Sequence, residues 1–131
     1  MTIRSHRDLI VWQKGMKLAN CVYRLTYLFP KSQTYSLCSQ MQRAAVSIPA
    51  NIAEGNGRST RRDYAHFLSM ALGSARELDT LLILARDLEM ASATQFRESM
   101  ELNDEVCRIL FRMRQNFGIG KGSEGQIWQP N

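Results

Sequence analysis

The sequence is poor in the features that define several special classes of protein. Three prolines and eight glycines among 131 residues are too few for a collagen-like or proline-rich architecture. No uncharged apolar run reaches the roughly 18 residues of a membrane-spanning helix, and residues 1–8 lack the apolar core of a signal peptide. We therefore expect a cytoplasmic protein with no membrane partner.

Reactive side chains are also scarce. The three cysteines, Cys21, Cys38 and Cys107, are odd in number and form no Cys-x-x-Cys pair, which argues against a disulfide framework and a zinc site. Asp63 and His66 have the i, i+3 spacing of di-iron ligands, but the second such pair that a di-iron bundle needs is missing. No Gly-x-Ser-x-Gly motif is present. We expect no metal, no cofactor and no catalytic residue, and hence no enzyme.

Helical periodicity is what the sequence does contain. The length and the 44% share of hydrophobic residues fit one globular domain. Apolar residues recur three and four positions apart in four segments, and no segment alternates as a strand would. The first helix is expected over 8–29, where Pro30 ends it, and the second over 35–54, with Gly55 as a left-handed C-cap.

Two further helices begin at capping boxes. Thr60-x-x-Asp63 opens the third and longest helix, and Ser92-x-x-Gln95 opens a fourth that continues to Phe117. The strongest periodic signal of the chain is a heptad-like seam on the third helix, formed by Tyr64, Leu68, Ala71, Ala75, Leu78, Leu82 and Ala85.

Four helices with short connections predict an all-α, up-down-up-down four-helix bundle. We expect the bundle to span residues 8–117. A flexible N-terminal arm precedes it at 1–7, and a glycine-rich C-terminal tail follows at 118–131.

The second helix carries a polar stripe with Pro49 inside it, where we expect a kink. If the helix ran on to Arg58, one face would hold Gln40, Arg43, Ser47, Asn51, Glu54 and Arg58. Two interpretations stay open. The stripe is a structural seam, in which Arg43 pairs with Glu54 and Asn51 caps backbone groups, or it contacts a ligand such as RNA.

The same helix has small apolar residues away from its main core face, at Val46, Ala50 and Ala53. A helix that is apolar on several sides is usually buried on several sides. A bundle this small cannot cover all of them, so we expect these residues to contact another copy of the chain in a homo-oligomer.

Charge is distributed unevenly. Residues 1–62 carry ten Lys and Arg against two acidic residues, whereas residues 63–131 carry seven against ten. The candidate nucleic-acid-binding residues are Arg43, Arg58, Arg61 and Arg62. The last three surround the expected start of the third helix, where free amides and the helix dipole also attract phosphate. Alternatively, these arginines pair with acidic residues of neighbouring subunits.

The run from Gln40 to Arg58, QMQRAAVSIPANIAEGNGR, resembles the signature of a family of four-helix bundles encoded in intervening sequences of bacterial large-subunit ribosomal RNA genes. Two more segments agree with it, DLIVWQ at 8–13 and FLSMALGSAREL at 67–78. The resemblance implies a cytosolic, non-enzymatic ring of five subunits, related to the nucleic-acid-binding accessory protein of diversity-generating retroelements. Ile127 and Trp128 match no family motif.

We therefore expect a non-enzymatic, ring-forming bundle that binds nucleic acid, with RNA favoured, through a basic surface. The alternative is a protein–protein scaffold or accessory subunit that does not bind nucleic acid directly.

Overall fold

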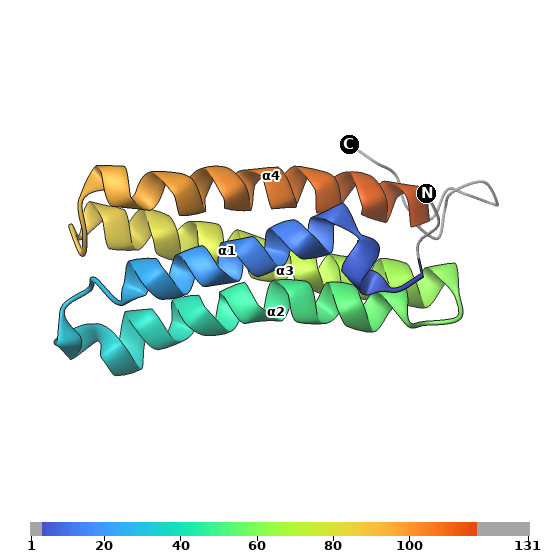
Figure 1. Ribbon diagram of the computed structural model, residues 1–131, viewed down its shortest axis with the longest axis horizontal. Coiled ribbons are helices and arrows are strands. Elements are labelled where there is room, and N and C mark those ends of the chain that lie inside the picture. The colour runs from blue at the N-terminus through green and yellow to red at the C-terminus, as the bar shows by residue number, and fades with distance from the viewer. Residues whose placement is uncertain (1–3, 118–131) are drawn as a thin grey trace.

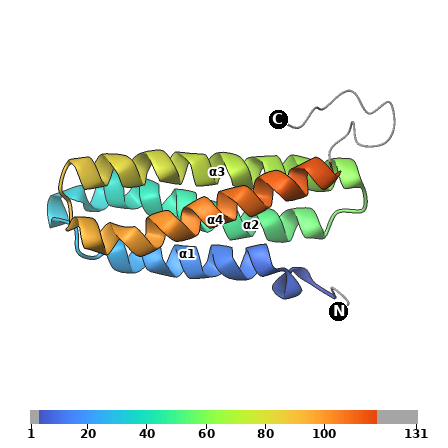
Figure 2. The same cartoon turned by 90° about the horizontal axis from the view of Figure 1, so that it is seen from above.

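The computed structural model describes residues 4–117 and shows four antiparallel helices. They are α1 (Ile10–Thr26), α2 (Ser39–Asn56), α3 (Arg61–Asp87) and α4 (Ala93–Phe117). Each helix packs against the next in sequence, and α4 packs back against α1 (Figure 1). Seen from above, α4 lies across the space between α1 and α3 (Figure 2). Residues 4–117 contain no strand, so the predicted all-α four-helix bundle is confirmed.

The core follows the predicted heptad seam. Leu68, Ala71, Ala75, Leu78 and Leu82 of α3 are fully buried. The row mixes leucines with the smaller alanines, which lets side chains from the other helices fit between the leucines. On α4 the same spacing buries three large side chains completely, those of Phe96, Val106 and Leu110.

Both predicted capping boxes are present at helix starts. The Thr60 hydroxyl accepts a hydrogen bond from the Asp63 amide at 3.1 Å. Ser92 and Gln95 form the reciprocal pair, in which each side chain accepts from the other residue's amide, at 3.3 and 2.9 Å. These bonds satisfy amides that have no partner inside the helix, and they fix where α3 and α4 begin.

The prediction that Gly55 ends the second helix as a left-handed cap is wrong. The helix continues to Asn56, and the residue that caps it, Gly57, has a right-handed φ of −86°. Gly55 instead lies buried where α2 and α3 touch. A Cβ on Gly55 would lie 2.8 Å from the Cβ of Phe67, so position 55 needs a glycine because the helices approach closely there.

The first two helices also start later than predicted. Leu9 is extended, with ψ of 127°, so α1 begins only at Ile10. Before α2 the chain forms a 3₁₀ helix, η2 (Lys31–Gln33), and one π-helical segment, η3 (Thr34–Cys38). Apolar periodicity marks which residues are buried in such segments, but it does not distinguish a 3₁₀ or π turn from an α turn.

Residues 4–7 differ from the flexible arm that the sequence predicted. His6–Asp8 form a 3₁₀ helix, η1, which is capped by Ser5. The Gln13 side chain donates to the Arg7 carbonyl at 2.8 Å, and the rings of His6 and Trp12 meet edge to face at 5.1 Å. These contacts hold the segment against α1. The predicted tail, 118–131, lies outside the described residues.

Candidate nucleic-acid interface

Arginines from separate parts of the sequence gather at one end of the bundle. The antiparallel arrangement places the starts of α1 and α3 beside the ends of α2 and α4 (Figure 1). This end, which we call the basic end, carries five exposed arginines, Arg4, Arg7, Arg58, Arg61 and Arg62. The sequence analysis grouped only the last three, because nothing in the spacing shows that η1 packs against α2.

Two of the three predicted arginines make contacts inside the chain. Arg58 forms an ion pair with Glu54 at 2.8 Å, and its guanidinium lies 4.7 Å from the ring centroid of Phe67. Both residues of the ion pair are largely exposed, so the pair contributes little to stability. It nevertheless offsets part of the positive charge at position 58.

Arg61 joins the start of α3 to the end of α4. Its guanidinium donates to the Asn116 carbonyl at 2.5 Å and lies 4.9 Å from the ring centroid of Phe117. The last carbonyls of a helix have no intrahelical partner and carry partial negative charge. Arg61 therefore caps α4, which is a structural role that the sequence analysis missed. Arg62 is exposed and forms no ion pair with any residue in 4–117.

Arg43 does not belong to this group. It lies on α2 about 20 Å from the helix end, at the usual rise per residue. There it lines a shallow hollow together with Tyr23, Gln42 and Val46. The Arg43–Glu54 pair of the structural interpretation does not form either, because the two residues are three turns apart and Glu54 pairs with Arg58.

Part of the polar stripe forms a hydrogen-bonded group between α2 and α3. Asn51 donates its side-chain amide to the carbonyl and the hydroxyl of Ser47, at 2.8 and 2.9 Å. Across the helix interface, the Ser74 hydroxyl donates to the Ser47 hydroxyl at 2.9 Å. Gln40 and Glu54 are exposed and lie outside this group. The sequence analysis missed Ser74, although a serine directly before Ala75 of the apolar seam was a usable signal.

The apolar strip on α2 faces outward. Val46 is 45% exposed, Ala50 is exposed and Ala53 is half-buried. A second feature on the outside of the bundle is Gly73, near the middle of α3. A Cβ on Gly73 would have no atom within 4 Å, so nothing within residues 4–117 requires a glycine there.

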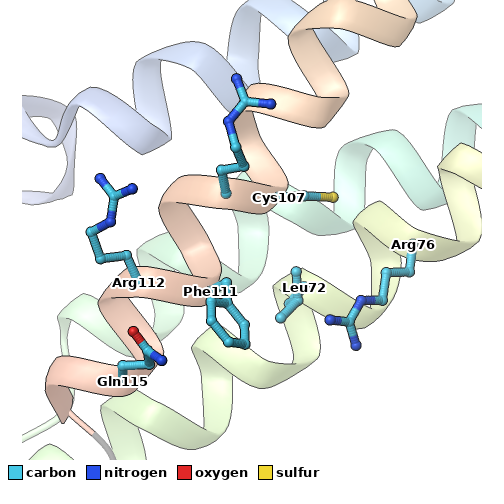
Figure 3. A pocket seen from close by; sticks show the side chains of 7 residues that line it. Leu72, Arg76, Cys107, Phe111, Arg112 and Gln115 are labelled. Atoms are coloured by element: carbon cyan, nitrogen blue, oxygen red, sulfur yellow. The ribbon is translucent and has the colours of Figure 1, made fainter. Parts of the chain in front are cut away.

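A second basic region, which the sequence analysis missed, lies between α3 and α4. We call it the α3–α4 groove. It has a volume of about 380 Å³ and is lined by Leu72, Arg76, Cys107, Arg108, Phe111, Arg112 and Gln115 (Figure 3). Arg76 lies on a different helix from the other two arginines, so only the packing of α3 against α4 brings them together.

The arginines of the groove lie beside acidic residues and beside one further arginine. Arg108 pairs with Asp104. Burial, and then the positive charge of Arg76, lower the pKa of Arg114, which lies one turn from the groove. Burial also raises the pKa of the Cys107 thiol, and the negative charge of Asp79 adds to that effect. Arg76 of α3 and Arg114 of α4 therefore lie close enough to repel each other.

Residues 4–117 hold neither a metal-binding cluster nor a membrane-spanning helix. No three His, Cys, Asp or Glu side chains in this range are grouped so that they could hold a metal ion. No described helix is long and apolar enough to cross a membrane.

The fold and the arginine-rich surfaces define a small antiparallel four-helix bundle with a strongly basic end. The family model of the 23S rRNA-intervening sequence protein matches residues 7–112. The chain belongs to this family, as its motifs indicated.

Comparison with solved structures supports the same fold. The chain is similar to a crystal structure from Bacteroides thetaiotaomicron VPI-5482, described as a protein with unknown function from the S23 ribosomal protein family. The TM-score is 0.73 at 23% sequence identity, and the match covers 80% of this chain and 98% of the other. Comparison with curated proteins gave no match.

Proposed function

We propose that the protein is a non-enzymatic, cytoplasmic bundle that assembles with copies of itself and binds nucleic acid, with RNA favoured. The observation that carries the nucleic-acid proposal is the basic end. Two separate segments of the chain, 4–8 and 54–63, supply its five arginines, and the acidic residues in the same segments are Asp8, Glu54 and Asp63. Arginine presents a planar fork of donors that matches phosphate oxygens.

Folding leaves most of the positive charge in the first half of the chain unneutralised. Among the Lys and Arg residues of 4–62, ion pairs to other described residues involve only Lys14, with Glu105 at 3.0 Å, and Arg58, with Glu54. A surface of this kind attracts polyanions over a range set by the salt concentration.

Two outward-facing features support self-assembly. One is the apolar strip Val46, Ala50 and Ala53 on α2, and the other is Gly73 on α3. A glycine inside an exposed helix costs about 1 kcal/mol relative to alanine, and close approach by another chain would account for it. Contact between these two features on neighbouring copies would be a head-to-tail interface, which closes into a ring when the rotation between copies allows it. The proposed number of subunits in the ring, five, rests on the resemblance to the family.

Nucleic-acid binding is tested by fluorescence anisotropy with labelled single-stranded RNA at several salt concentrations. The variant Arg4→Gln, Arg7→Gln, Arg62→Gln removes three charges that make no ion pair in residues 4–117. It should bind more weakly, and the slope of log affinity against log salt should flatten by about 0.7 per lost phosphate contact. The matched control is Lys31→Gln, Arg86→Gln, Arg97→Gln, which removes three charges at the opposite end of the bundle and should change both quantities little.

Failure of the wild-type protein to bind RNA or DNA at low salt would overturn nucleic-acid binding and favour the protein–protein scaffold. Binding without a salt slope would overturn the phosphate-contact mechanism.

Assembly is tested by light scattering. Ala50→Glu should lower the mass while keeping the helical circular dichroism, because the interface would bury an unpaired charge. Ala93→Glu, at the exposed start of α4, is the matched control and should keep the mass. A monomeric wild-type protein at micromolar concentration would refute self-assembly.

A further inference from the structure

We propose that the α3–α4 groove binds a nucleotide of single-stranded nucleic acid, with the base against Phe111 and Leu72 and the neighbouring phosphates on Arg76 and Arg112. This inference rests on the proposed nucleic-acid binding and adds a second site and a preference for unpaired strands.

The floor of the groove is apolar and of suitable size for a base. Leu72 is almost completely buried and closes the floor, while Phe111 is half-buried. The Arg114 guanidinium lies 5.5 Å from the centroid of the Phe111 ring, and the rest of the ring offers surface to a ligand. Figure 3 shows the two side chains next to each other, with Arg76 beside Leu72. The volume of about 380 Å³ lies in the range of small-ligand sites.

The rim supplies positive charge from both helices. Arg76 extends from α3, while Arg108 and Arg112 lie one turn apart on α4. Asp104 offsets Arg108, but neither Arg76 nor Arg112 has an ion pair with a described residue. The positive charge of Arg76 also acts on Arg114 of α4. A bound phosphate would be attracted to Arg76 and Arg112, which makes an anionic ligand fit better than a neutral one.

The combination of an aromatic floor and a guanidinium rim favours a single strand over a duplex. Bases in a duplex are stacked on each other and cannot lie on a protein ring, whereas unpaired bases stack on aromatic side chains. Gln115 on the same rim has both a donor and an acceptor for a base edge. A duplex could contact the groove only through its phosphates and the arginines.

The experiment compares labelled single-stranded RNA of 12 nucleotides with its duplex, using the full-length assembled protein and anisotropy. The variant Arg76→Gln, Arg112→Gln should weaken single-strand binding about tenfold or more and flatten the salt slope by about 1.4. The matched control is Arg86→Gln, Arg97→Gln, which removes one arginine from each of the same two helices and should change affinity less than twofold.

Phe111→Leu separates stacking from charge. It should weaken single-strand binding about fivefold or more and leave duplex binding unchanged. Ultraviolet cross-linking of the wild-type protein to the single strand gives a readout that does not depend on a variant's folding. Mass spectrometry should place a cross-link in the peptide that contains Phe111.

Three outcomes would overturn the inference. If the Arg76, Arg112 variant binds as tightly as wild type while the basic-end variant does not, the groove is not a site but the proposed function stands. If cross-links form only in peptides without Phe111, the base does not lie in the groove. If the wild-type protein binds no nucleic acid, both proposals fail together.

Discussion

Gly55 of α2 and Phe67 of α3 lie so close that a Cβ on Gly55 would be 2.8 Å from the Cβ of Phe67. The same Cβ would be 3.0 Å from the Tyr64 ring. A side chain at position 55 would therefore clash with both residues. The same Phe67 ring carries the Arg58 guanidinium on its face. The helix contact and the position of one basic-end arginine therefore depend on the same glycine.

Gly55→Ala should destabilise the protein by about 1–3 kcal/mol, because the backbones must separate to admit the methyl group. This loss exceeds the gain in helix propensity of alanine over glycine. Urea unfolding measures the change. Gly57→Ala is the control, since its nearest atom would be the Glu54 carbonyl oxygen at 3.7 Å. Equal or higher stability of Gly55→Ala would show that α2 and α3 tolerate separation.

Gly73→Ala should have opposite effects on the helix and on the assembly. In the monomeric background of Ala50→Glu, the free energy of unfolding should rise by about 1 kcal/mol, because the position is open and alanine favours the helix. In the wild-type background, sedimentation should show weaker self-association. A stabilised protein with unchanged mass would place the subunit contact away from Gly73.

Asn51→Leu should destabilise the fold, because it removes both bonds that Asn51 donates to Ser47. Ser47 and Asn51 are half-buried, and the Ser47 hydroxyl keeps its bond from Ser74, so the loss should be about 0.5–1.5 kcal/mol. Thermal unfolding measures the change, and Gln40→Leu on the exposed part of the stripe should alter it little. Unchanged stability together with lost RNA binding would instead favour the ligand-contact interpretation.

Arg61→Ala should lower the melting temperature more than Arg62→Ala. The first change removes the contact with Asn116 and the ring of Phe117, which we expect to cost about 0.5–1 kcal/mol at this exposed position. The second removes a side chain without an ion pair in residues 4–117. Both variants should lose RNA affinity, so equal melting temperatures would contradict the capping role of Arg61 only.

Stability should fall as the pH rises through the alkaline range. Burial raises the pKa of the Cys21, Cys38 and Cys107 thiols in the folded protein. Unfolded thiols lose their protons from about pH 8.5, where the folded thiols keep theirs. The folded state then holds more protons than the unfolded state, so raising the pH favours unfolding. Urea unfolding from pH 7 to 10 should show this loss, and Cys107→Ser should make it shallower. A flat profile would contradict the prediction.

The bundle could be predicted from the sequence because its core depends on local periodicity. Leu68, Leu78 and Leu82 recur at heptad spacing, and two capping boxes mark helix starts without reference to any distant residue. The end of α2 could not be predicted in the same way. Gly55 has the residue type of a helix cap, and only the approach of Phe67, twelve positions along the chain, makes it a packing residue instead.

The candidate sites were predictable only in part. Counting charges along the chain identified the first half as basic, but it could not show which arginines are engaged. Arg61 bonds to Asn116, and Arg76 lines one groove with Arg108 and Arg112. No sequence motif links residues so far apart in the chain. The prediction that Arg43 belongs with the other arginines is wrong. Arg43 shares a helix face with Arg58, but residues on one face can be far apart along the helix axis.

The bond from Arg61 to Asn116 joins positions 55 residues apart in the chain. Terminal helical turns ordinarily fray one by one, since their outermost backbone groups lack partners. Here the first turn of α3 and the last turn of α4 share a side chain, so neither can open without releasing the other. The opening of these two turns is therefore coupled, and their amide hydrogens should exchange with solvent at related rates.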